Sequence, residues 1–387
     1  MQVLKLAQQY IACRSVTFES VNEATQWLHS QLLELGFECH VQEYLDGNGL
    51  QKLRLSAKRE PPSENLGVAA GHTSPLAFFC HTDVVPVDGW QAPFGPFSAE
   101  IADGRLWGRG ACDMKGPTAA ALAAIATIKP SEQTQPIYFF ATGDEECGME
   151  GARLLSTDCR LFDELIARDG VGVIGEPTSM QVVNAHKGAC HLVFTSRGVA
   201  AHSSTGEGEN ANWKLIPWLA YLKERHEHSM VDDQLNNLNF TPSSLTMNLI
   251  IKNEPTIANI TVGTAACHIF LRPTPETKWE EFVADIVNRS QDYDVELTRK
   301  VSLAPVRTPP NRPLVSSCLM LLGQTEPQCV SFATDGCSFQ RLKDLVVIGP
   351  GSIQQAHRPD EWISIEQLAK GTEGYSKIFR WFTCKSN

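Results

Sequence analysis

Four short runs of apolar residues place the strongest constraint on the fold of this chain. Each run is followed at once by polar, glycine-rich sequence. A short continuous apolar run of this kind is typical of a strand that is buried on both faces, as in a parallel sheet covered by helices. The sequence therefore predicts an α/β fold with a mostly parallel sheet flanked by helices. The runs are Leu76–Cys80, Ile137–Ala141, Val171–Ile174 and Leu345–Ile348.

Two segments before the first run have different patterns. Thr17–Gly36 has apolar residues at helical spacing and ends at a glycine, which predicts a helix. Gln51–Thr73 contains scattered glycines and the pair Pro61-Pro62. We therefore predict mostly loop or an edge strand for that segment.

The residue pattern from Gly188 to Lys300 predicts the order strand, helix, strand, strand, helix and strand. This is the order of a ferredoxin-like unit. We therefore predict an α+β domain at residues 188–300, inserted into a catalytic domain formed by residues 1–187 and 301–387. Its helices would cover one sheet face and leave strand edges free. Such a domain is expected to act as a lid and to form a homodimer by edge pairing.

Charge and composition exclude several classes of partner. The 33 Lys and Arg and 44 Asp and Glu give a net charge of −11, whereas nucleic-acid and anionic-membrane binders need clustered positive charge. The longest apolar run, Pro117–Ile128, is too short to span a bilayer. The N-terminal residues lack the apolar core of a signal peptide, and the twelve cysteines form no C-x-x-C pair. We expect a cytoplasmic protein with free thiols and no nucleic-acid or membrane partner.

Seven residues capable of chemistry are expected to gather at one edge of the predicted sheet. Six lie in polar segments that follow the apolar runs, and the seventh lies on a neighbouring loop. Ligands of open α/β sheets bind beyond the carboxyl ends of the strands, where such segments meet. Each residue alone has an ordinary explanation, such as a turn, a helix cap or a solvated acidic pair. The seven residues are His81, Asp83, Asp113, Glu145, Glu146, Glu176 and His357.

The five carboxylates of this set would repel one another and keep protons unless a cation lay among them. Two divalent ions remove the repulsion, and mixed histidine and carboxylate ligands suit zinc, with cobalt or manganese as alternatives. Such a pair of ions can share an attacking hydroxide and polarise a carbonyl. Asp83 can accept the second ring N–H of His81. Glu145, next to Glu146, is free to act as the general base of a hydrolase.

Three other classes of protein are disfavoured by particular residues. A dinucleotide-binding loop is disfavoured because Gly108-x-Gly110 lacks the third glycine. A serine hydrolase is disfavoured because no G-x-S-x-G sequence occurs. A metal-binding protein without catalysis is disfavoured because the base and the ligands are all present.

The motifs around these residues resemble those of the co-catalytic zinc amidohydrolases. This family includes acetylornithine deacetylase, succinyl-diaminopimelate desuccinylase, aminoacylase and glutamate carboxypeptidase, and the resemblance runs over nearly the whole chain. Ala185–Gly188 and Gly349–Glu361 are most similar to acetylornithine deacetylase. The motifs are His81-Thr-Asp83-Val-Val-Pro86, Gly108-Arg-Gly-Ala-Cys-Asp-Met-Lys-Gly116, Asp144-Glu-Glu146, Gly175-Glu-Pro-Thr-Ser179 and Gly349-Pro-Gly-Ser-Ile353 followed by His357.

The resemblance implies roles for the seven residues. Glu145 is expected to be the base, and the Asp113–Met114 peptide bond is expected to be cis. The implied metal ligands are His81 and Glu176 at one ion, Glu146 and His357 at the other, and Asp113 as the bridge between them.

The resemblance also implies residues that contact the substrate. His202 is expected to stabilise the oxyanion, and in dimeric relatives this histidine comes from the partner subunit. Asn259 and Arg272 are expected to hold the substrate carboxylate, for which the planar guanidinium group of arginine is suited. Lys187 and Thr334 lie in segments that are also expected to bind the substrate.

The implied reaction is hydrolysis of the amide bond of a small N-acyl amino acid. N2-acetyl-L-ornithine is the first expectation, giving ornithine and acetate in arginine biosynthesis. The segment Thr334-Asp335-Gly336, however, is closer to the desuccinylase than to acetylornithine deacetylase. Desuccinylation of succinyl-diaminopimelate, or hydrolysis of another N-acyl amino acid or a dipeptide, therefore stays open.

Overall fold

The computed structural model describes residues 2–65 and 74–385. The described chain divides into two compact units. The second unit comprises Ala185–Arg307 and Cys329–Ala333, and the first comprises the rest. Among the described residues, no helix combines the length and the apolar composition needed to cross a membrane.

The first unit is built on a mixed sheet whose centre consists of the four predicted strands. In spatial order its strands are β1 (Glu38–Leu45), β2 (Gln51–Arg59), β6 (Ile137–Thr142), β3 (Leu76–His81), β7 (Val171–Ile174) and β15 (Leu345–Val347). β6, β3, β7 and β15 are parallel to one another, as predicted. β1 and β2 are antiparallel additions beyond β6, and at the other end Val347 pairs antiparallel with Val183.

β2 corrects the expectation for Gln51–Thr73. The strand is neither a loop nor an edge, because it pairs with β1 on one side and with β6 on the other. Lys52 and Arg54 are buried in it, and their charged ends reach partners far away in the sequence. Residues 66–73 of the predicted segment lie outside the described residues.

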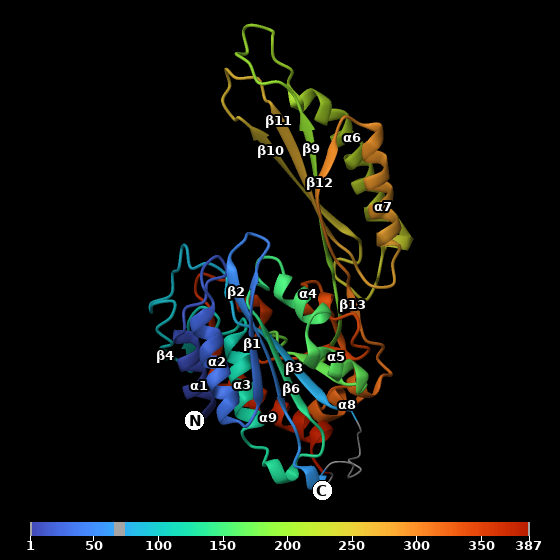
Figure 1. The fold of residues 1–387 in the computed structure, drawn as a ribbon. Helices are drawn as coiled ribbons and strands as arrows, with labels where there is room; N and C mark the ends of the chain where they lie inside the picture. The colour runs from blue at the N-terminus through green and yellow to red at the C-terminus, as the bar shows by residue number, and fades with distance from the viewer. Residues whose placement is uncertain (1, 66–73, 386–387) are drawn as a thin grey trace. The chain divides into compact units, whose positions relative to one another are not determined.

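Helices cover both faces of this sheet (Figure 1). They are α1 (Gln2–Ala12), α2 (Asn22–Glu34), α3 (Lys115–Ile125), α4 (Glu150–Thr157), α5 (Arg160–Ala167), α8 (Pro313–Leu322) and α9 (Ile365–Thr383). Phe78 of β3 packs against Tyr375 of α9, whereas the next residue, Phe79, packs against Phe162 of α5. Because successive side chains enter different apolar layers, the strand is apolar throughout, which explains the continuous runs in the sequence.

A small sheet lies beside the loop that precedes α3. It consists of β4 (Ile101–Ala102), β5 (Arg105–Trp107) and β16 (Trp362–Ser364). β5 pairs with both neighbours, and its pairing with β16 joins segments that are far apart in the sequence. The polar segments that follow β5 and precede β16 are thereby brought together.

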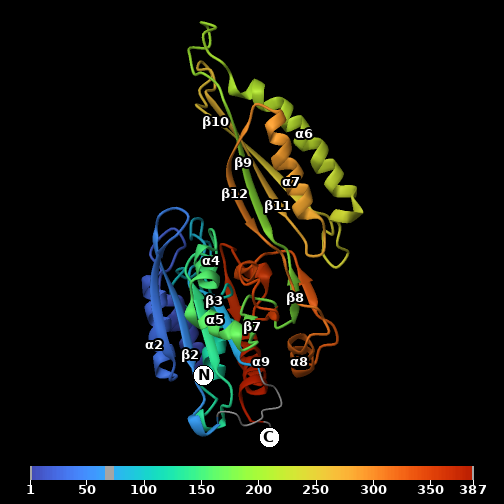
Figure 2. The ribbon, with the colours of Figure 1, turned by 45° about the vertical axis from the view of Figure 1, so that its right-hand side comes forward.

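The second unit has the predicted order of elements. They are β9 (Ala189–Arg197), α6 (Ala211–Val231), β10 (Thr246–Glu254), β11 (Thr264–Arg272), α7 (Trp279–Arg289) and β12 (Glu296–Leu303). The strands form an antiparallel sheet in the order β10-β11-β9-β12. Both helices lie on the same face of this sheet (Figure 2) and share a core with it around Phe194 and Trp218. β8 (Val183–His186), β13 (Val306–Arg307) and β14 (Gln328–Val330) lie where the chain passes between the units.

Candidate metal centre

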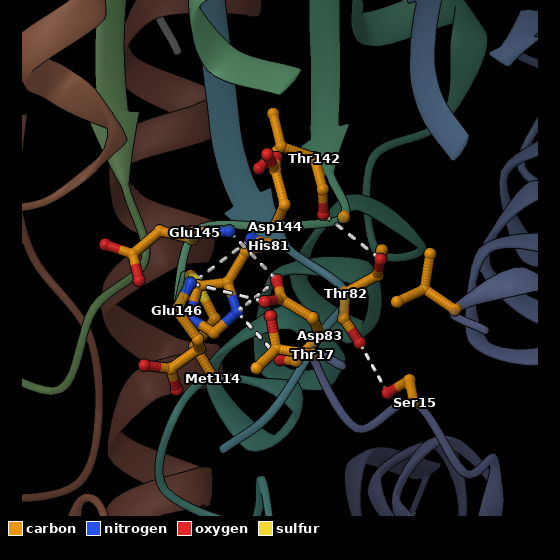
Figure 3. Close-up of polar contacts among 12 residues, drawn as sticks. Ser15, Thr17, His81, Thr82, Asp83, Met114, Thr142, Asp144, Glu145 and Glu146 are labelled. Atoms are coloured by element: carbon orange, nitrogen blue, oxygen red, sulfur yellow. Dashed lines mark hydrogen bonds and ion pairs between the residues drawn. The ribbon is translucent and has the colours of Figure 1, made fainter. Parts of the chain in front are cut away.

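The carboxyl ends of the parallel strands bring the predicted residues together. His81 is the last residue of β3, and Glu176 lies two residues beyond β7. Glu145 and Glu146 lie in the turn that joins β6 to α4, close to His81 and Asp83 (Figure 3). The convergence predicted from strand ends is therefore present in the fold.

Asp113 lies between two imidazole groups. Its Oδ1 is 3.0 Å from Nε2 of His81, and its Oδ2 is 3.4 Å from Nε2 of His357. The same nitrogen of His81 is 3.6 Å from Oε1 of Glu176, and that of His357 is 2.9 Å from Oε2 of Glu146. Asp113 is thus shared by two histidine–carboxylate groups: His81 with Glu176, and His357 with Glu146. The peptide bond between Asp113 and Met114 is cis, as the resemblance implies.

These separations fit two zinc sites with a shared ligand. With metal–ligand bonds of about 2.0–2.1 Å, neighbouring ligand atoms of a tetrahedral zinc site are about 3.3 Å apart. The four separations around Asp113 range from 2.9 to 3.6 Å. Ligand atoms of His81, Asp113 and Glu146 also lie within 4.8 Å of one another. The imidazole and carboxylate donors suit zinc and admit cobalt or manganese.

The cluster carries more acidic groups than its two histidines can balance. Burial raises the pKa of Glu146 to about 7 and raises the pKa of Glu145 and Glu176 well above the usual range. Hydrogen bonds with Asp113 and Glu146 raise the pKa of His357 to about 10. The protein alone therefore retains protons on groups that bind a metal only after losing them. A divalent cation would take the place of these protons.

Asp83 ties the end of β3 to the turn that carries the predicted base. Its two carboxylate oxygens accept hydrogen bonds from the backbone N–H groups of Glu145 and Glu146, each at 3.2 Å (Figure 3). Nδ1 of His81 is 2.9 Å from the backbone oxygen of Asp83 and 3.5 Å from its carboxylate. Asp83 is thus the partner of His81, as predicted, but mainly through its backbone, while its carboxylate holds the turn.

Glu361, which no sequence pattern singled out, holds the loop of Asp113. The pairing of β16 with β5 brings this buried carboxylate to the loop. It accepts hydrogen bonds from the N–H groups of Cys112 at 2.8 Å and Asp113 at 3.0 Å, and from the guanidinium of Arg109 at 2.7 Å. A carboxylate bound in this way fixes the position of Asp113. The only signal in the sequence was its place soon after His357 in one motif.

Thr334, predicted at the substrate site, is fully buried in the first unit. Its hydroxyl accepts a hydrogen bond from the N–H of Gly336 at 3.1 Å, at the start of a short 3-10 helix. The next residue, Asp335, accepts a hydrogen bond from the hydroxyl of Thr142 at the end of β6. This loop therefore lies against the strand that leads to Glu145, and a contact of Thr334 with substrate stays a prediction.

Two predicted residues of the second unit lie together in neighbouring loops. His202 forms a backbone bridge with Ile260, and the N–H of Ser203 donates to the carbonyl of Asn259 at 2.9 Å. The His202 side chain is exposed, with Nδ1 at 2.8 Å from the hydroxyl of Ser204. His202 and Asn259 thus form one polar group at one end of the unit's sheet.

Arg272 and Lys187 lie at the other end of that sheet. β11 runs from Thr264, close to the Asn259 loop, to Arg272, and its eight steps of about 3.4 Å separate these ends by about 27 Å. Lys187 is buried and donates to the carbonyl of Pro242 at 2.8 Å. Within one chain, His202 and Arg272 are therefore too far apart to contact one small substrate.

Comparisons with known proteins agree with this geometry. Residues 77–381 match the profile of peptidase family M20/M25/M40. The acetylornithine deacetylase of Pectobacterium carotovorum subsp. carotovorum (strain PC1) is 33% identical over 315 residues, covering 78% of this chain and 79% of that protein. That of Proteus mirabilis (strain HI4320) is 31% identical over 380 residues, covering 94% and 92%.

Solved structures share the fold over nearly the full length. An M20 family metallo-carboxypeptidase from Sulfolobus solfataricus has a TM-score of 0.73 at 19% identity, covering 98% of this chain and 99% of that chain. A dinuclear metal-binding peptidase of the M20 family from Bacillus subtilis has a TM-score of 0.63 at 12% identity, covering 98% and 96%. Because the family profile spans most of the sequence, the chain belongs to peptidase family M20/M25/M40.

Proposed function

We propose that this protein is a metal-dependent amidohydrolase that cleaves the amide bond of an N-acyl amino acid. The observation that carries the proposal is Asp113, shared by two histidine–carboxylate groups, with Glu145 beside them. The substrate we propose first is N2-acetyl-L-ornithine, which yields ornithine and acetate. The names of the relatives with 33% and 31% identity support this choice. The reaction would then belong to arginine biosynthesis.

The ligand set follows from the two groups around Asp113. We propose zinc as the native metal, with cobalt or manganese as replacements. When bound, two such ions polarise the scissile carbonyl and lower the pKa of the attacking water. The ligands would be His81 and Glu176 at one ion, Glu146 and His357 at the other, and Asp113 at both.

Glu145 is the general base of the proposed mechanism. Its carboxylate takes a proton from the attacking water and passes it to the amine nitrogen as the C–N bond breaks. His202 donates a hydrogen bond to the oxyanion of the tetrahedral intermediate. Arg272 of one subunit and Asn259 of the partner subunit bind the substrate carboxylate, and Lys187 and Thr334 belong to the segments around the substrate.

The proposed function is tested by a substrate panel on protein of known metal content. The panel contains N-acetyl, N-succinyl and N-formyl derivatives of ornithine, other amino acids and diaminopimelate, together with dipeptides. We expect the highest kcat/KM for N-acetylornithine. A preference for the succinyl substrates would favour desuccinylation, in line with the Asp335-Gly336 segment. If the metal-loaded protein hydrolysed no member of the panel, the proposed function would be wrong.

We also propose a homodimer formed through the second unit. β10 is an end strand of the four-stranded sheet, and its Leu249, Ile250 and Ile251 are 40–49% exposed. Neighbouring α6 exposes an apolar stripe at helical spacing, with Trp213 73% and Ile216 49% exposed, followed by Pro217 and Ala220. An unpaired strand edge beside an apolar helix face fits a second copy of the same surface.

A dimer also explains how residues at opposite ends of β11 can contact the same substrate. The strand separates Arg272 from the loops of His202 and Asn259 by about 27 Å. The length of β11 limits the distance between Arg272 and His202 only within one chain. A substrate held by Arg272 of one subunit can therefore be reached by His202 of the partner subunit. We therefore propose that each active site uses residues of both subunits.

This sharing predicts the activity of a mixed dimer. We expect the homodimers of Glu145→Gln and of His202→Ala to be about 100-fold or more less active than the parent. In a mixed dimer with one subunit of each kind, one of the two sites has an intact Glu145 and an intact partner His202. Co-expression with two affinity tags and purification over both should give about half of the parent activity per dimer. A mixed dimer as inactive as both homodimers would place His202 in the site of its own chain.

Lysine substitutions test whether the surface of β10 and α6 forms the dimer interface. Leu249→Lys combined with Ile251→Lys is expected to give a monomer in light scattering, because two charges would be buried in the interface. Leu238→Lys is the matched control, since Leu238 is 91% exposed in the same unit but lies outside β10 and α6. An unchanged dimer in the double variant would exclude this surface.

We further propose a cytoplasmic location. All twelve cysteines are free in the structure, which suits a reducing compartment.

A further inference from the structure

We propose that Tyr44 is a positioning residue for the turn that carries Glu145 and Glu146. This inference rests on the proposed function, because it concerns the same metal ligand and base. Tyr44 belongs to β1, which no motif of the sequence connects with the site. It acts through Asp144, the residue directly before Glu145 (Figure 3).

The carboxylate of Asp144 anchors the turn through three hydrogen bonds. Its side chain is fully buried, and its Oδ2 accepts a hydrogen bond from the N–H of Glu150 at 2.8 Å. Its Oδ1 accepts from the N–H of Gly151 at 2.9 Å and from the hydroxyl of Tyr44 at 2.6 Å. The carboxylate thus joins the turn to the start of α4 and to β1. A shift of Asp144 would move Glu145 and Glu146, which follow it in the chain.

Tyr44 contacts the turn at two successive residues. Its oxygen donates to Asp144 and accepts from the N–H of Gly143 at 3.2 Å. Tyr44 is only 8% exposed and pairs in register with Lys52 of β2. The ammonium group of Lys52 is bound by backbone carbonyls, one of them that of Glu19 at 2.9 Å. The hydroxyl of Tyr44 is therefore presented from a buried position that is paired within the sheet.

The absence of a side chain at Gly151 leaves room for the hydroxyl of Tyr44. A Cβ atom at Gly151 would lie 2.4 Å from the Tyr44 oxygen and 2.8 Å from Oδ1 of Asp144, closer than side-chain atoms approach each other. Any larger residue at this position would push Tyr44 and Asp144 apart. The close approach of α4 and the tyrosine ring thus depends on the missing side chain of Gly151.

The turn is consequently held from two sides. Asp83 of the β3 end binds the N–H groups of Glu145 and Glu146, and Tyr44 of β1 binds Asp144 and Gly143. Without the Tyr44 hydroxyl, Oδ1 of Asp144 keeps only the N–H of Gly151. Groups that hydrogen-bond a metal ligand directly are worth about 10–100-fold in metal affinity or activity. Tyr44 acts on the residues just before the proposed ligand, so we expect an effect at the lower end of this range.

The test is the variant Tyr44→Phe, which removes one oxygen atom. Competition with a chromophoric chelator should show zinc affinity about tenfold lower than in the parent. With N-acetylornithine, kcat should fall about tenfold while KM stays unchanged, because the base acts in the transition state and not in substrate binding. Tyr138→Phe is the matched control. Tyr138 is a fully buried tyrosine of β6 whose hydroxyl donates to Glu164 at 2.9 Å, in the same sheet but at the far end of the strand from the turn.

Both phenylalanine variants should lose a similar amount of thermal stability, and only Tyr44→Phe should lose zinc affinity. Gly151→Ala, which disturbs the same contact from α4, should show the same loss of zinc affinity. If Tyr44→Phe matched Tyr138→Phe in zinc affinity and in kcat, the inference would be overturned. The zinc measurement needs no substrate, so it decides the role of Tyr44 even if the substrate panel rejects the proposed function.

Discussion

Glu145→Gln is expected to lower kcat for N-acetylornithine by about 10³-fold while leaving the metal content unchanged. Glutamine has nearly the same size and can keep the backbone hydrogen bond between residue 145 and Asp83. It cannot accept the proton of the attacking water or deliver one to the leaving amine. The prediction follows from the position of Glu145 in the turn after β6, directly beside the proposed ligand Glu146 (Figure 3).

Steady-state kinetics and elemental analysis on the same sample check this prediction. KM should change little, since the lost interaction belongs to the transition state. Glu373→Gln is a matched control, because Glu373 is an exposed residue of α9 that pairs with Lys377. A Glu145→Gln protein that kept its metal and the parent rate would remove Glu145 from the mechanism.

The residues that follow the buried parallel strands could be predicted to meet, because burial on both faces leaves a continuous apolar run in the sequence. Phe78 and Phe79 enter different apolar layers, so β3 is apolar at every position and is recognisable as a strand covered on both faces. Parallel strands end at the same edge of a sheet, and therefore the residues after them meet. For this reason His81, Glu146 and Glu176 could be placed together from the sequence.

Contacts between distant segments were not predictable in this way. Glu361 reaches the N–H of Asp113 across 248 positions, and Tyr44 reaches Asp144 across 100 positions. Neither contact leaves a periodic pattern, because each depends on which strands become neighbours. The same holds for Lys52 in β2, whose charge is satisfied by backbone carbonyls that no local pattern indicates.

The separation of His202 from Arg272 depended on strand register. Both residues resembled positions of one active site, and the sequence alone placed no distance between them. In the structure, Arg272 ends β11, whereas His202 bridges the loop that precedes the start of this strand, and the strand between is about 27 Å long. This separation supports the homodimer proposed above, in which His202 would reach the site of the partner subunit.

Removal of the metal is expected to abolish activity and to lower the Tm. A ligand that binds only the folded state at about 100–1,000 times its Kd stabilises it by about 2.7–4.1 kcal/mol. Dialysis against a chelator should therefore give a less stable, inactive protein, and zinc or cobalt should restore both properties. Asp113→Asn is the matched control, because it lacks the shared carboxylate and its Tm should not respond to zinc. Fully active material without a bound transition metal would contradict the whole assignment.

The stabilisation by zinc is also expected to grow as the pH rises from about 5 to 8. In the metal-free protein, burial raises the pKa of Glu146 from its ordinary value of 4.5 to about 7. Glu146 then binds more protons in the folded state than in the unfolded state between these values, so its contribution to stability is greatest below about 4.5 and is lost as the pH rises through about 7. Bound zinc replaces that proton, so the zinc-loaded protein should not share this fall. Thermal unfolding with and without zinc across this range measures the difference, and a zinc-induced shift in Tm that stayed constant with pH would show that no proton is displaced from the cluster.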